Sequence, residues 1–318
     1  MENHGTIMRI LSLVSLGLLR RATDQSRAPR RRNPRRNPLL RTLAHIVLLG
    51  LVSMSSHTAL AQDGHERVLP YPAQYRTASR DELQRAANFS KRIERELGRR
   101  NARIAIVFRA TQPREAMETG QRYDHGALWV HSPIETIEGE TVYGYAVYGL
   151  QRSALSARRS ELVQDWPLDF ILPETAGEVG IIIPSAAMQD RMLAILGSDA
   201  YPALHQPAWS RISNPGDRRY QNSAEFLLDI VGAAAWSTTD RLRIKVNLTA
   251  WFEPATVRYG WFGRLTAGWF DPELRLDDQR RVIRFADYDS LANFMLDFNL
   301  ADSVFELSNA DEELQPID

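Results

Sequence analysis

The sequence predicts a single α+β domain, and three observations support that prediction. Short runs rich in β-branched and aromatic residues, which are typical of strands, alternate with segments whose apolar residues have helical spacing. No internal repeat and no second composition regime divides the chain of 318 residues. Its apolar and charged fractions, 44% and 25%, are those of an ordinary globular protein. We place the domain at residues 79–305, after a linker at 62–78 and before an acidic tail at 306–318.

A helix is expected to open the domain. Ser79 is followed three residues later by Glu82, which is the spacing of a capping box. Apolar residues then recur at helical spacing until the helix ends near Gly98: Leu83, Ala86, Phe89, Ile93 and Leu97.

Four strands are expected next. Residues 102–110 form a β-branched run of strand length, and residues 125–131 and 141–150 flank a Glu138-Gly139 turn as a hairpin. Residues 177–184 form the fourth strand. Ser185 is then expected to cap a helix whose inner face carries Ala187, Met188, Met192, Leu193 and Leu196.

A further helix is expected from Ser223 to about Ala235, with mixed structure after it as far as Phe305. Asn222 can cap this helix, and Glu225 can reach back to close a capping box. Its inner face carries Phe226, Leu227, Ile230, Val231 and Ala234, so the helix is expected to pack against another element.

Residues 1–61 read as a basic leader that ends in a secretory signal peptide. Ten arginines against Glu2 and Asp24 give the leader a charge of +8, which leaves the body at −8 because the whole chain is neutral. An apolar run at 43–52 precedes Ala59-Leu60-Ala61, so we expect cleavage after Ala61 and a periplasmic or secreted protein. The run is about half of the roughly 20 residues that span a bilayer, so no permanent membrane span is expected.

The charge and the missing motifs restrict the function. An acidic body lacks the basic surface of a nucleic-acid binder, so we expect no nucleic-acid partner. The chain has no cysteine. It also has no G-x-x-x-x-G-K phosphate-binding loop, no H-E-x-x-H zinc motif and no G-x-S-x-G nucleophile elbow. We therefore expect no metal and no cofactor. The sequence indicates no oligomeric state.

Two residues are candidates for chemistry. His125 begins a predicted strand, where a side chain can emerge at the end of a sheet, although a half-buried histidine satisfied by the backbone is the more common interpretation of such a position. Ser223 is the first residue of a predicted helix, where the helix dipole and the N–H groups would support a nucleophile. The same position also suits an ordinary residue near a cap. His131 lies six residues beyond His125, about 20 Å along the strand, so the two cannot share a site.

Several segments together resemble a known family: "YDHGALWV", "GYAVYGL", "LVQDWPLDF", "VGIIIP" and "YQNSAEF". They are similar to an exported bacterial family catalogued as domain of unknown function 2145, over about residues 85–300. That family in turn resembles the circularly permuted papain-like fold of bacterial cell-wall peptidases and lecithin retinol acyltransferase. The resemblance implies an antiparallel sheet packed on a helix that carries the nucleophile position.

The resemblance also implies site residues. Such a site opens its helix with Cys in an Asn-Cys-x-Glu context; here Asn222 and Glu225 match, while Ser223 stands at the Cys position. His125 matches the base. The hairpin places His125 opposite positions 148–152, which nominates Tyr148 or Gln151 as the third, orienting residue. Asp165 is a candidate for ligand binding, or else belongs to a packed loop with capping acids over 161–170.

Three functions follow from this sequence. The leading hypothesis is a papain-like site without its thiol, which binds a peptide, acyl or cell-wall ligand and catalyses weakly or not at all. A second is an active serine hydrolase or acyltransferase that uses Ser223 and His125, because a serine hydroxyl needs a base to take its proton. A third is an envelope scaffold without a cleft.

Overall fold

A computed structural model describes residues 78–118, 120–136, 139–175, 177–258, 271 and 273–309. All of these residues belong to one compact unit, Asp63–Asp318. The expected leader, nearly all of the expected linker and the end of the expected tail lie outside the described residues.

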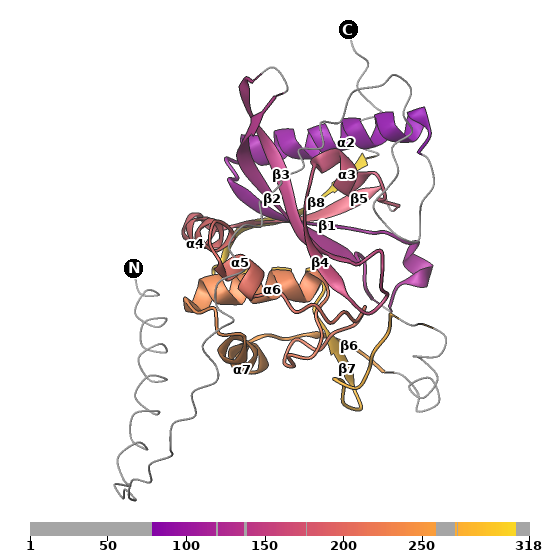
Figure 1. Ribbon diagram of the computed structural model, residues 1–318, viewed down its shortest axis with the longest axis vertical. Helices are drawn as coiled ribbons and strands as arrows, with labels where there is room; N and C mark the ends of the chain where they lie inside the picture. Colours follow the sequence, from indigo (N-terminus) through magenta and orange to yellow (C-terminus); the bar gives the residue numbers. More distant parts are fainter. Residues whose placement is uncertain are drawn as a thin grey trace, which may run out of the picture. The chain divides into compact units, whose positions relative to one another are not determined.

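The architecture is α+β, with a fully antiparallel six-stranded sheet in the order β4-β3-β2-β1-β5-β8 (Figure 1). Its strands are β1 (Ile104–Arg109), β2 (His125–Glu135), β3 (Thr141–Arg152), β4 (Ser160–Asp165), β5 (Glu178–Pro184) and β8 (Ala301–Ser308). The longer helices are α2 (Arg80–Arg99), α4 (Ala186–Leu196), α6 (Ser223–Trp236), α7 (Arg241–Trp251) and α9 (Tyr288–Asp297). Shorter elements are η1 (Arg114–Ala116), α3 (Pro167–Ile171), α5 (Ala200–Ala203) and the small sheet of β6 (Ala255–Val257) and β7 (Ile283–Phe285).

Helices α2 and α3 cover one face of the large sheet (Figure 1). The expected capping box starts α2: the Glu82 N–H donates to Ser79 Oγ at 3.2 Å, and the Ser79 N–H donates to Glu82 Oε2 at 2.8 Å. Phe89, Ile93 and Leu97 of α2 are buried against the sheet, as their spacing predicts. We call this side of the sheet the α3 face.

Helix α6 lies against the opposite face, which we call the α6 face (Figure 1). Nearly every residue of α6 is buried, because the sheet covers one side of the helix and α7 packs on another. Most of these buried residues are apolar, and full burial of each large apolar side chain contributes about 1.5–3 kcal/mol. The start of α6 is therefore held firmly against the sheet.

The sheet alternates its side chains between these two faces. In β2, Leu128 and Val130 join the core on the α6 face, whereas Ala127 and Trp129 join the core on the α3 face. The hairpin pairing is as expected, with Leu128 opposite Tyr148 and Ala127 opposite Gly149. The side that each candidate residue faces follows from this alternation.

The structure corrects three details of the predicted elements. Residues 161–165 are part of an edge strand, β4, and α3 follows at Pro167, where a packed loop is predicted. Ser185 occupies the N-cap position of α4 but makes no side-chain capping hydrogen bond, and Ala187 is exposed because Met188, Gln189 and Met192 face inward. Residues 306–308 belong to β8 and not to a tail.

Candidate functional site

The start of α6 is fixed by Asn222. Its Oδ1 accepts the Glu225 N–H at 2.9 Å, and its Nδ2 donates to the Arg211 carbonyl at 2.8 Å. Asn222 is thus the N-cap that the sequence predicts, and Ser223 is the first residue of the helix.

The Ser223 hydroxyl is buried where the beginning of β2 meets the beginning of α6. Ser223 is only 1% exposed, and its Oγ accepts the Gly126 N–H at 3.3 Å. A Cβ atom on Gly126 would lie 2.7 Å from Leu227 Cδ1, so the lack of a side chain at Gly126 lets α6 approach the sheet this closely. Ser223 therefore contacts the backbone next to His125.

The His125 ring lies on the other side of the sheet. Gly126 faces α6, and the neighbouring residue in a strand faces the opposite side. The ring lies 5.7 Å from the ring of Phe170 in α3, and His125 is buried. The structure therefore does not bring the His125 ring and the Ser223 hydroxyl together.

The environment of His125 favours a neutral ring. Burial, and then the charge of Arg109, lower the pKa of His125 well below its ordinary value of 6.5. Arg109 ends β1 directly opposite His125, and its guanidinium lies 4.8 Å above the Phe170 ring. The ring is thus uncharged at neutral pH and is part of the packing on the α3 face.

The two nominated orienting residues lie on opposite faces of the sheet. Tyr148 pairs with Leu128 and so lies on the α6 face, where its ring packs edge-on to Tyr201 at 6.5 Å. The hairpin pairs Ala127 with Gly149, and two further pairs along the same register put Gln151 opposite His125, on the α3 face. Of the four nominated catalytic residues, Ser223 and Tyr148 thus share one face, and His125 and Gln151 share the other.

Asp165 closes β4 beside α3, and it also lies on the α3 face because it pairs with Val147. Burial, and to a lesser extent the neighbouring Asp169 carboxyl, raise the pKa of Asp165 to about 6, although the Trp166 N–H and Arg109 oppose the change. Sequence reasoning gave no role to Arg109. The available signal was a charged residue at the end of a strand that is otherwise entirely apolar.

Glu225 does not close the predicted capping box. Its Oε1 instead lies 2.5 Å from Lys245 Nζ of α7, and the same ammonium lies 2.6 Å from Asp229 Oδ1. Asp229 also accepts from Gln221 Nε2 at 2.7 Å and pairs with Arg241 Nη2 at 3.3 Å. These side chains form a buried charge network between α6 and α7 that the sequence did not predict.

The network holds one acid with an unusual pKa. Burial raises the pKa of Glu225 to about 7; the charge of Lys245 lowers it, and that of Asp229 raises it. Glu225 and Asp229 are completely buried and Lys245 nearly so, which leaves little water to stabilise charge there. The network can therefore gain or lose a proton near neutral pH.

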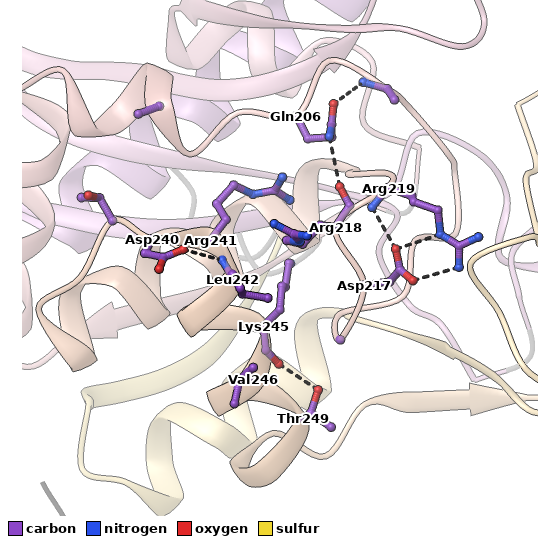
Figure 2. Close-up of a pocket in the computed structure, with 14 residues that line it drawn as sticks. Gln206, Asp217, Arg218, Arg219, Asp240, Arg241, Leu242, Lys245, Val246 and Thr249 are labelled. Atoms are coloured by element: carbon purple, nitrogen blue, oxygen red, sulfur yellow. Dashed lines mark hydrogen bonds and ion pairs between the residues drawn. The ribbon is translucent and has the colours of Figure 1, made fainter. Parts of the chain in front are cut away.

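A groove of about 1140 Å³ lies beside this network (Figure 2). One wall is the loop of residues 216–219, and the other comes from residues 239–249 at the start and along one side of α7. Figure 2 shows Arg241, Leu242, Lys245, Val246 and Thr249 on the α7 side and Asp217, Arg218 and Arg219 on the loop side. Neither Ser223 nor His125 lines this groove.

The two other histidines of the described residues have local partners. His205 Nε2 lies 3.0 Å from Ser160 Oγ, and burial, followed by the charges of Arg241 and Arg159, lowers the pKa of His205. His131 stacks on Tyr143 in the β2–β3 hairpin, with 5.8 Å between the ring centres. The His205 ring also lies edge-on to Phe226 of α6, with 6.4 Å between the ring centres.

Two features are absent from the described residues. None of the helices in the described part of the chain is long and apolar enough to cross a membrane. Within the same residues, no group of three or more His, Cys, Asp or Glu side chains is arranged to hold a metal ion.

Comparison with known proteins identifies the family. No curated protein and no solved structure matches the chain. Residues 96–295 match the model of a family described as an uncharacterized protein conserved in bacteria (DUF2145). Since this match covers more than half of the 318 residues, the chain belongs to the DUF2145 family.

Proposed function

We propose that this protein is an exported, papain-like domain that binds a peptide, acyl or cell-wall ligand and does not use Ser223 as a nucleophile. The observation that carries the proposal is the environment of Ser223: a buried hydroxyl that accepts the Gly126 N–H, with the His125 ring on the other face of the sheet.

The chemistry of serine supports this reading. A serine hydroxyl becomes an efficient nucleophile only when an adjacent base takes its proton during attack. The nearest candidate base in the family resemblance, His125, packs against Phe170 instead. A thiol in the same place could ionise without a base in contact, because the start of a helix lowers the pKa of a thiol. The hydroxyl at Ser223 has no comparable route.

A groove between α7 and the loop of residues 216–219 offers another place for a ligand. The groove beside α7 is large enough for a small ligand or a short segment of a chain, and it is lined by charged and polar side chains. We therefore place ligand binding in this groove and not at Ser223.

Two measurements test the proposal. The purified protein should hydrolyse model esters and amides no faster than its Ser223→Ala variant, because among the described residues the hydroxyl contacts the Gly126 N–H and not a base. Fragments of peptidoglycan, short peptides or acyl compounds should raise the thermal midpoint of unfolding in proportion to binding. An acyl group trapped on Ser223 would establish the serine hydrolase instead, and the absence of stabilisation by all three ligand classes would favour the scaffold.

A further inference from the structure

We infer that the groove between residues 216–219 and α7 binds a polar, carboxylate-bearing ligand, such as a peptide chain with free carboxylates, and that Arg218 is its main contact. This inference rests on the proposed function, because it assumes that the groove is the ligand site, and it goes further by favouring peptide or cell-wall ligands with carboxylates over acyl ligands.

The lining of the groove favours a polar ligand over an acyl chain. Most of its side chains are polar or charged, and the apolar contribution comes from Ala203, Ala208, Leu242 and Val246. Leu242 and Val246 are 50% and 61% exposed, so they edge the groove and do not form an enclosed apolar channel. A buried alkyl chain needs such a channel, since its binding energy comes from apolar area removed from water.

Three of the four cations that line the groove already have acidic partners. Arg219 forms a two-point contact with Asp217, with Nε–Oδ1 and Nη2–Oδ2 distances of 3.0 Å and 2.8 Å. Arg241 and Lys245 contact the buried acids Asp229 and Glu225. The one acid on the α7 side, Asp240, caps that helix by accepting the Leu242 N–H at 2.9 Å.

Arg218 is the cation that remains available. Its side chain is exposed, and its guanidinium makes no hydrogen bond or ion pair with the part of the chain that the structure describes. Its backbone is nevertheless held in place, because its carbonyl accepts from Gln206 Nε2 at 3.0 Å (Figure 2). A guanidinium has five N–H donors in a planar fork, which matches a carboxylate through two parallel hydrogen bonds.

The buried network beside the groove adds to this preference. The charged groups that face Glu225 are Lys245 from α7 and Asp229 from α6, and Arg241 faces Asp229 from the groove side. When Glu225 takes a proton, two cations remain against one carboxylate, and the side of the groove formed by Arg241 and Lys245 becomes more positive. An anion in the groove favours that protonated form, so the ligand should bind more tightly at pH 6 than at pH 8.

Isothermal titration calorimetry on the full chain tests the inference with three probes. The first is the mixture of soluble fragments released from purified peptidoglycan by a muramidase, and the second is the same mixture after its carboxylates are converted to amides. The third is octyl glucoside below its micelle concentration, as a neutral alkyl probe. Arg218→Glu is the test variant, and Arg243→Glu is its control. Arg243 is exposed on α7, the helix that forms the other wall, but its side chain does not line the groove.

The expected result is binding of the acidic fragments that weakens about tenfold or more in Arg218→Glu and stays within about twofold in Arg243→Glu. Amidation of the fragments should have an effect similar to that of Arg218→Glu. Binding of the alkyl probe alone, an equal effect of both variants, or indifference to amidation would overturn the inference while leaving a ligand-binding protein. Hydrolysis of the fragments that is lost in Ser223→Ala would instead overturn the proposed function and leave the dependence on Arg218 intact.

Discussion

The Ser223 hydroxyl lies at the start of α6, where backbone N–H groups favour an anion, but burial and the Gly126 N–H determine its behaviour. We expect a thiol in the Ser223→Cys variant to react with iodoacetamide more slowly than an exposed thiol in Ala194→Cys, because reagent must reach a residue that is 1% exposed. Adding His125→Ala should leave the rate at position 223 unchanged. Mass spectrometry of alkylated protein over time measures both rates.

The opposite result would be equally informative. A thiol at position 223 that reacts faster than the exposed control, and slows when His125 is removed, would show that the His125 ring reaches that position in solution. The hydrolase geometry that the family resemblance implies would then be restored.

Glu225 gives a prediction about pH, because its pKa is raised from 4.5 to about 7 in the folded protein. Between these two values the unfolded chain loses a proton that the folded protein keeps, so this group makes the protein less stable as the pH rises from about 4.5 to about 7. The Glu225→Gln variant lacks the effect. Relative to the natural protein, it should therefore gain stability between pH 5 and pH 8, on the order of 2 kcal/mol.

Urea unfolding of both proteins at the two pH values measures that difference. The comparison of variants is needed because His125 acts in the opposite direction: its lowered pKa makes the protein lose stability as the pH falls below 6.5. The same stability difference at pH 5 and pH 8 would show that Glu225 is ionised throughout this range.

At the scale of elements, the contact between β2 and α6 depends on Gly126. A Cβ atom there would lie 2.7 Å from both Leu227 Cδ1 and Phe108 Cε1, which is closer than such atoms pack. We expect Gly126→Ala to lower the free energy of unfolding by about 1–3 kcal/mol, which is typical of overpacking in a core.

Gly98→Ala is the matched control. It lies in α2, and no atom lies within 4 Å of the added methyl group. Alanine favours a helix more than glycine does, so this variant should be as stable as the natural protein or more stable by up to about 1 kcal/mol. A similar loss in both variants, measured by urea unfolding, would show that the close approach at Gly126 is not responsible.

The sequence predicted the elements whose signals are local. The capping box of Ser79 and Glu82 and the Asn222 cap each lie within four residues, and the hairpin register follows from one turn. Strand β4 was missed because it lies at the edge of the sheet, so only part of it is buried and its apolar alternation is weak.

The candidate site was less predictable from the sequence. It depends on which face of the sheet each strand residue occupies and on contacts between residues that are far apart in the sequence. The sequence places His125 near the start of α6, but a shift of one residue decides which face of the sheet its ring occupies. The adjacent glycine is the one that faces α6. Glu225 and Lys245 lie 20 residues apart and meet only because α7 packs against α6.

At the scale of the whole molecule, the two parts of the chain carry opposite charge. Residues 1–61 have ten arginines and two acids, a net charge of +8, and the remainder carries a net charge of −8. A basic, apolar leader that ends in small residues is typical of a secretory signal, whereas the body is a domain of the DUF2145 family. We therefore propose that the protein functions outside the cytoplasm after the leader has been removed.

That proposal predicts one mature form. Because Ala59-Leu60-Ala61 has the small residues that signal peptidases accept, protein recovered from the cell envelope should begin at Gln62, and Ala61→Arg should block its processing. Intact-mass spectrometry distinguishes the two forms, and isoelectric focusing provides an independent check, since loss of the leader removes a charge of +8 and leaves an acidic protein. A chain that reaches the envelope with residues 1–61 attached would show that the apolar segment anchors the domain and does not merely direct its export.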